Sequence, residues 1–242
     1  YRGELDLSSA LNEAGSVRGR VMAARQDRHT QLDHYSRDAS VFYGILEADL
    51  GPRTRLTLGA DFQDNKPRGS TWGGIPLLNA NGDFNDMPRS FNNGARWSRW
   101  EQYTRTAFAT LEHSFDSGWV AKLQLNRQIN GYDANLGSAP AGFPNPPDAS
   151  GVGMWPGQYL GRTTSNAADF YVSGPFRLGG REHELVLGGS LTNRHWKNRG
   201  WWDTGSYDTT VDNYYLWRGD VAAPAWGAMP DFTNDETTRE RG

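Results

Sequence analysis

Side chains that could perform catalysis are present in this chain, but their spacing fits no known catalytic arrangement. Two acidic pairs, Asp61/Asp64 and Asp83/Asp86, are spaced as solvated loop acids usually are. The sequence contains no GxSxG motif, no glycine-rich phosphate loop and no cysteine. The histidines lack the HExxH spacing of a zinc-binding helix; they are His29, His34, His113, His183 and His195. The sequence therefore predicts that the protein is not an enzyme.

One loop has a composition that could suggest a cation site. Residues 79–86 are rich in Asn and Asp, but they lack the spaced acids and the terminal Glu of an EF-hand. We therefore expect no metal site in this loop and no metal held by the protein's own side chains.

Aromatic side chains have the clearest potential for binding, because they give large contact areas at low entropic cost. They form three clusters: Trp72, Trp97, Trp100 and Tyr103; Trp155 and Tyr159; and Trp196, Trp201, Trp202, Tyr214, Tyr215 and Trp217. Trp72 is the strongest single candidate, because nearby glycines leave its ring accessible. Arg89 could contact an anionic ligand group. The alternative is that these rings pack together and stiffen long loops, and that Arg89 forms an ordinary salt bridge.

Strands must position these residues, because apolar and polar residues alternate along most of the chain. Leu56, Leu58, Ala60 and Phe62 would share one strand face, opposite Arg55, Thr57, Gly59, Asp61 and Gln63. Eight strands are predicted at about 2–11, 17–28, 36–50, 54–65, 100–115, 119–133, 162–176 and 182–197. Most exceed the usual soluble strand and suit a tilted crossing of a bilayer.

The connections between the predicted strands alternate in length. Four are short and turn-like, at 12–16, 51–53, 116–118 and 177–181. The others lie at about 29–35, 66–99, 134–161 and 198–242, and three of these are long. Short turns at one end and long loops at the other are typical of outer-membrane β-barrels. A soluble β-sandwich is the alternative, although shorter strand spacing would suit it better.

Composition supports a barrel wall. The hydrophobic fraction is 36%, and the mean hydropathy is −0.74. Only one face of a barrel strand meets lipid, so a low apolar content is expected. The formal net charge of −3 gives no general footprint for nucleic acid. The apolar runs are too short for a transmembrane helix. The start at Tyr1, without a signal peptide, suggests a processed chain or part of a longer one.

Charged side chains on the polar strand faces would line the barrel interior. There they would pair with an interior domain or simply face water, and the pattern does not decide between the two. They are Glu4, Asp6, Arg18, Arg20, Glu47, Asp49, Arg55, Glu112, Lys122 and Glu184.

Several whole segments resemble the TonB-dependent ferric-siderophore receptors, in particular the branch for hydroxamate-containing ligands such as coprogen, ferrioxamine or pyoverdine. The segments include KPRGSTWGGIPL at 66–77, MPRSFN at 87–92 and WSRW at 97–100. VFYGILEADL at 41–50 and TAFATLEHSF at 106–115 are also similar to that branch. The resemblance covers about residues 2–200.

The resemblance implies a fold and a function. It implies eight strands of a probable 22-stranded barrel, without the plug domain or the TonB box through which the TonB complex would energise import. The ligand would be a ferric siderophore, so iron would arrive already chelated and no cofactor is expected. Cobalamin or a glycan on the same architecture, or an outer-membrane enzyme barrel, remain alternatives. We also expect no strand after about residue 197, so that the chain would end within an extracellular loop.

Overall fold

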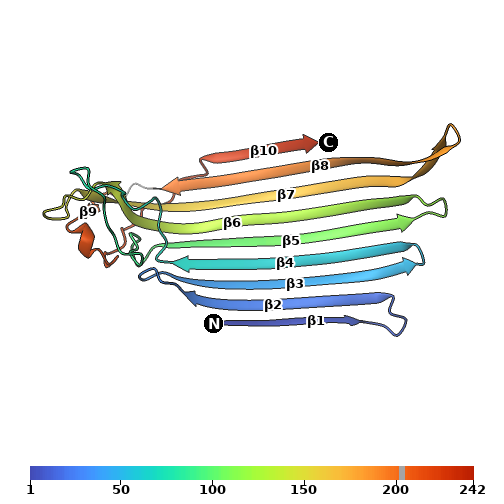
Figure 1. Ribbon diagram of the computed structural model, residues 1–242, viewed down its shortest axis with the longest axis horizontal. Coiled ribbons are helices and arrows are strands. Elements are labelled where there is room, and N and C mark those ends of the chain that lie inside the picture. The colour runs from blue at the N-terminus through green and yellow to red at the C-terminus, as the bar shows by residue number, and fades with distance from the viewer. Residues whose placement is uncertain (202–204) are drawn as a thin grey trace.

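The computed structural model describes residues 1–201 and 205–242. Within them, the strands form one antiparallel sheet, in which the first eight lie in sequence order and consecutive ones are hydrogen-bonded to each other (Figure 1). The first eight strands are β1 Arg2–Ala10, β2 Val17–His29, β3 Ser36–Gly51, β4 Thr54–Arg68, β5 Arg99–Ser114, β6 Val120–Gly142, β7 Val152–Leu178 and β8 Arg181–Trp201. This up-and-down order confirms the predicted all-β fold class. In the described residues, no helix has the length and apolar character needed to cross a membrane.

Successive connections lie at opposite ends of the sheet. Short turns join β1 to β2, β3 to β4, β5 to β6 and β7 to β8, at the right of Figure 1. The longer connections gather at the left, where the segment between β4 and β5 folds over the strand ends. We call these the turn end and the loop end. The connections therefore alternate between the two ends as predicted, but the connection at 30–35 is no longer than the turn at 11–16.

The structure corrects the expectation that no strand follows residue 197. Strand β10, Asn234–Arg241, pairs antiparallel with β8 over its whole length. Its sequence, NDETTRER, contains no apolar residue and therefore lacks the alternation on which the other strands were predicted. Backbone hydrogen bonds form the ladder and do not require apolar side chains, which is why pattern reasoning missed this strand.

The hairpin of β6 and β7 also extends further than expected. The sequence predicts a long loop at 134–161, but residues 134–142 and 152–161 continue both strands as a paired ladder. The connection is reduced to residues 143–151. Glycine and proline are uncommon inside strands, and their presence here, including the Gly137–Pro156 pair, is why the sequence does not predict these strand extensions. Burial of Leu136, Val152 and Met154 supplies the stabilisation that local propensity does not.

The two faces of the sheet differ in chemistry, as the alternation predicts. The register places Phe42 beside Phe62 and Leu46 beside Leu58 on one face, which we call the outward face. Leu58 is 43% exposed and Phe62 47% exposed, so these residues are not buried in a soluble core. The charged residues predicted to line the interior all occupy the opposite face, which we call the inner face.

The buried core lies at the loop end and not along the sheet. A small strand, β9 Thr210–Val211, pairs with the start of β7, and a 3-10 helix, η1 Tyr214–Leu216, follows it. Tyr214 is fully buried, and its ring meets Phe91 edge-on at 5.1 Å between centroids. We call this cluster the loop-end cap; its buried apolar members are Phe91, Ala95, Ala139, Ala149, Val152, Met154, Val211 and Tyr214.

Candidate ligand-binding site

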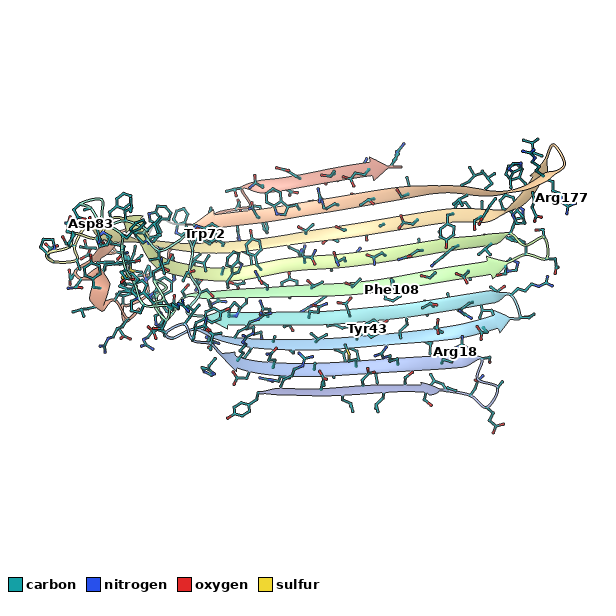
Figure 2. The ribbon with its side chains drawn as sticks, in the orientation of Figure 1. Arg18, Tyr43, Trp72, Asp83, Phe108 and Arg177 are labelled. Atoms are coloured by element: carbon teal, nitrogen blue, oxygen red, sulfur yellow. The ribbon has the colours of Figure 1, made fainter. Side chains whose placement is uncertain are left out.

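Three of the predicted aromatic residues meet at the loop end of the inner face. The ring of Trp72 lies 5.5 Å from that of Trp100 and 5.8 Å from that of Tyr159, centroid to centroid. Trp72 and Tyr159 are stacked with an interplanar angle of 22°. Figure 2 shows Trp72 at the junction between the loops and the strands. We call these three residues the mouth cluster.

Strand register brings Trp100 and Tyr159 together. Ala134 of β6 pairs with Trp100 of β5 on one side and with Tyr159 of β7 on the other. The three therefore share one row of the inner face, and the methyl group of Ala134 leaves room between the two large rings. Residues 59 positions apart in sequence become near neighbours in this way.

Hydrogen bonds to its backbone hold Trp72 in place, so its side chain remains available for contacts. The hydroxyl of buried Ser138 accepts a hydrogen bond from the Trp72 N–H at 3.2 Å and donates one to the Trp72 carbonyl. The next residue, Gly73, has φ +89, and a Cβ there would approach Pro140 at 2.9 Å. Only glycine suits this turn. The Trp72 side chain remains 42% exposed.

Known receptor proteins are similar to this chain over almost its whole length. The chain is 51% identical over 238 residues to the ferripyoverdine receptor of Pseudomonas aeruginosa, covering 98% of this chain and 29% of the relative. It is 31% identical to the ferric-pyoverdine BN7/BN8 receptor of Pseudomonas putida, covering 98% and 30%. No protein-family model matches it.

A solved structure gives the same result. The crystal structure of the Pseudomonas aeruginosa outer-membrane ferripyoverdine receptor, bound to ferripyoverdine, superimposes with a TM-score of 0.93 at 52% identity. The match covers 99% of this chain and 32% of that one. Over nearly its whole length, the chain matches one segment of these outer-membrane ferric-siderophore receptors. It spans about a third of the length of the relatives it matches. The predicted family and the predicted outer-membrane location are thus confirmed, and the outward face of this receptor wall is its lipid-facing side.

Two other residues that were predicted to bind ligand lie elsewhere in the structure. Trp97 packs against the loop-end cap, with its ring 5.9 Å from that of Trp226. Tyr103 lies on the outward face, where its ring covers Gly131 and the Arg105 guanidinium stands 5.2 Å above it. The structure therefore brings neither residue to the mouth cluster.

The remaining candidates are dispersed around the loop end. Arg89 is exposed in the segment between β4 and β5. Trp155 is 55% exposed, on the same face as Tyr159 but further toward the loops. Trp196 occupies the inner face of β8, and Trp201 is the last residue of that strand. Trp202 lies outside the described residues.

Sequence reasoning did not single out two residues that lie beside the mouth cluster or hold one of its members. Tyr132 shares the inner face with the mouth cluster, one row nearer the turn end, and its ring covers Gly161. Its even-numbered position in β6, in phase with Asn126 and Asn130, was a usable signal. Ser138 fixes Trp72 across 66 positions of sequence, and no local pattern could have shown that contact.

One charge network of the inner face lies far from the mouth cluster. At the turn end of the inner face, Arg18 contacts Asp49 at 2.6 Å and Glu47 at 3.6 Å, and Arg55 contacts Asp49 at 3.2 Å. Figure 2 places Arg18 far from Trp72. In the described part of the chain, no three His, Cys, Asp or Glu side chains gather to hold a metal ion. The mouth cluster therefore offers aromatic surface and not metal ligands.

Proposed function

We propose that the receptor of which this wall forms part imports a ferric siderophore of the pyoverdine class, and that the mouth cluster contacts its organic shell. The observation that supports this most directly is the convergence of Trp72, Trp100 and Tyr159 on the inner face at the loop end. Two curated relatives, one of them half identical, are named as ferric-pyoverdine receptors.

The chemistry of the ligand suits such a surface. A siderophore supplies its own iron ligands, so the protein needs no resident cofactor and no coordinating side chain. What it requires is a concave aromatic and polar surface that excludes water around the chelator. Aromatic rings supply that contact at low entropic cost. Arg89 remains a candidate contact for an anionic group on the ligand. Transport, energised by the TonB complex through the plug and TonB box, would belong to the complete receptor, and no enzymatic step is assigned to it.

The test measures binding of ferripyoverdine to the complete receptor. Tryptophan fluorescence quenching gives the dissociation constant for the parent protein and for Trp72→Ala. A central aromatic contact contributes about 2 kcal/mol or more, which corresponds to about a thirtyfold loss of affinity. Phe84→Ala is the matched control, because Phe84 is 76% exposed in the same segment and belongs to no cluster.

The two variants separate the possible results. We expect Trp72→Ala to bind weakly and Phe84→Ala to bind as the parent does. Unchanged binding in a folded Trp72→Ala receptor would remove the mouth cluster from the site. Failure of the parent receptor to be quenched by ferripyoverdine would overturn the proposed ligand class itself.

A further inference from the structure

Two arginines face each other at the loop end of the inner face. Arg28 of β2 is the register partner of Arg37 of β3, and both residues belong to the inner face. Like charges directly opposite each other across an antiparallel strand pair repel and destabilise the ladder. The position of this pair therefore calls for a counter-charge from elsewhere.

The wall supplies no acid to this arginine pair. On β1, the Glu4 carboxylate is already held by Arg2 at 2.7 Å, and in the turn between β2 and β3 the Asp33 carboxylate accepts a hydrogen bond from Ser90. In the described part of the chain, neither arginine of the pair forms a salt bridge. The adjacent inner-face residues of β2, β3 and β4 are neutral: Gln26, Ala39, Asn65 and Pro67.

Hydrogen bonds connect one arginine of the pair to the strand that carries Trp100. The Arg37 guanidinium donates to the side-chain carbonyl of Asn65, and the Asn65 amide donates to the side chain of Gln102 at 3.0 Å. Gln102 lies two residues from Trp100 on the same face of β5 and pairs with Tyr132. A chain of neutral partners thus orients Arg37 and ends beside the mouth cluster.

The arginine pair lies within reach of a ligand that covers the mouth cluster. Pro67 lies opposite Arg37, and the register of β4 and β5 places Pro67 level with Trp100. Neighbouring strands are about 4.8 Å apart, so the backbones of Arg37 and Trp100 are about 10 Å apart across β4. Trp100 and Tyr159 are separated by the same number of strands on the other side. A ligand that spans those two rings therefore has to extend only as far again to reach Arg37.

We propose that Arg28 and Arg37 form an anion subsite, which holds a carboxylate of the ferric siderophore while another part of the ligand contacts the mouth cluster. This rests on the proposed function and adds a charged contact to the aromatic one. The guanidinium fork matches the two oxygens of a carboxylate, and the bound carboxylate supplies the counter-charge that the wall lacks. Asn65 is a positioning residue, because it orients the Arg37 guanidinium. Such a subsite selects acidic siderophores over neutral ones.

The test measures ligand binding to the complete receptor by tryptophan fluorescence quenching. Two forms of ferripyoverdine are compared: one with its free carboxyl groups intact, and one in which the carboxyl groups that do not bind iron have been converted to amides. The double variant Arg28→Gln/Arg37→Gln should bind the carboxyl form about tenfold or more weakly than the parent does, because charge-assisted hydrogen bonds are lost. It should bind the amide form as the parent does.

A matched control and a second variant sharpen the test. The control Lys122→Gln/Arg194→Gln also removes two positive charges from the inner face, but nearer the turn end. It should stay within about twofold of the parent for both ligand forms, because salt screens distant charges. Asn65→Asp places a carboxylate beside Arg37, where it competes with the ligand for the guanidinium. This variant should weaken binding of the carboxyl form and leave binding of the amide form unchanged.

The two ligand forms separate the possible results. Equal loss for both forms in the arginine double variant would show that the pair holds another part of the receptor, such as an acid of an interior domain, and would overturn the subsite. Unchanged binding of the carboxyl form would overturn it as well. In both cases the proposed function stands if Trp72→Ala still weakens binding. Failure of the parent to bind either form would overturn the proposed function together with the subsite.

A single substitution keeps the proposal testable if the double variant does not form a heat-modifiable barrel. Arg28→Gln is then measured alone, because the Arg28 side chain makes no polar contact with the described residues and its loss should not disturb folding. It should weaken binding of the carboxyl form only. No loss in this variant would be equally decisive against the subsite.

Discussion

The loop-end cap and the sheet wall are stabilised in different ways. The cap has a buried core around Tyr214 and Phe91, with Ser98 and Asn93 buried among the loops. The wall has no such core, since its apolar side chains, such as Phe42 and Leu46, remain exposed on the outward face. The cap is held by tertiary packing as in a soluble domain. The wall is held by its ladder of backbone hydrogen bonds and needs lipid on one side.

This contrast predicts where shortening a side chain will lower the stability of the folded protein. Large-to-small substitution should act strongly in the cap, because it leaves a cavity that the loops cannot fill. In the wall, the severe change is the introduction of charge on the lipid side.

Removing Tyr214 should open the cap. Tyr214→Ala deletes a fully buried ring, and such changes cost about 3–5 kcal/mol. Hydrogen exchange on the complete receptor should show faster exchange in β9 and in residues 143–151, with β3 and β4 unchanged. Leu216→Ala is the control in the same 3-10 helix, because Leu216 is 70% exposed. Loss of protection spread through the wall would contradict the separation of the two regions.

Charge on the lipid side should destabilise the wall in a face-dependent manner. Leu58→Arg places a guanidinium on the outward face and should cost about 2–4 kcal/mol near the bilayer midplane. Thr57→Arg, one residue away, points to the inner face and should cost little. Guanidinium unfolding of the complete receptor in lipid vesicles measures both. Equal costs would show that the two faces are assigned incorrectly.

A hydrogen bond in the cap should matter more than one in the wall. The Ser98 hydroxyl donates to the Ser70 carbonyl at 2.5 Å and accepts from the Gly137 N–H at 3.3 Å, and Ser98 is fully buried. Ser98→Ala should cost about 1–3 kcal/mol, because two backbone groups lose their partner out of contact with water. Ser9→Ala, on exposed β1, should be nearly neutral in the same unfolding measurement. A larger effect at Ser9 would contradict the prediction.

The smallest expected effect is a loss of stability at low pH. In the connection between β6 and β7, the Ser150 N–H donates to the Asp148 carboxylate at 3.0 Å. This hydrogen bond, with a smaller contribution from the Ser150 hydroxyl, holds the pKa of Asp148 below its ordinary value. A lowered pKa contributes stability at neutral pH, which is lost as pH falls from about 3.9 through the lowered value.

Carbon-13 NMR of the Asp148 carboxyl against pH checks this. Ser150→Ala keeps the backbone N–H and removes only the hydroxyl, so it should move the titration of Asp148 part of the way upward. A midpoint at or above the ordinary value in the parent would show that the bond does not form in solution.

Local pattern was sufficient for most of the wall and for part of the site. The alternation of apolar and polar residues in 54–65 predicts which side chains share a face, and β4 places them on those faces in the structure. Trp72 could be selected because its glycine neighbours are adjacent in sequence. Tyr103 could not be placed as readily, because loop and strand meet near residue 99 and the face of an aromatic residue there depends on register.

Strand phase, the alternating ends of the connections and the polar inner face could all be inferred from local sequence. Each of these depends on residues a few positions apart, and side chains in a strand alternate with a period of two. Only the tertiary structure decided that β10 returns to pair with β8, and that Trp72 meets Trp100 and Tyr159. Those contacts depend on cross-strand register between distant segments and on burial beneath the cap, neither of which is encoded in any local window.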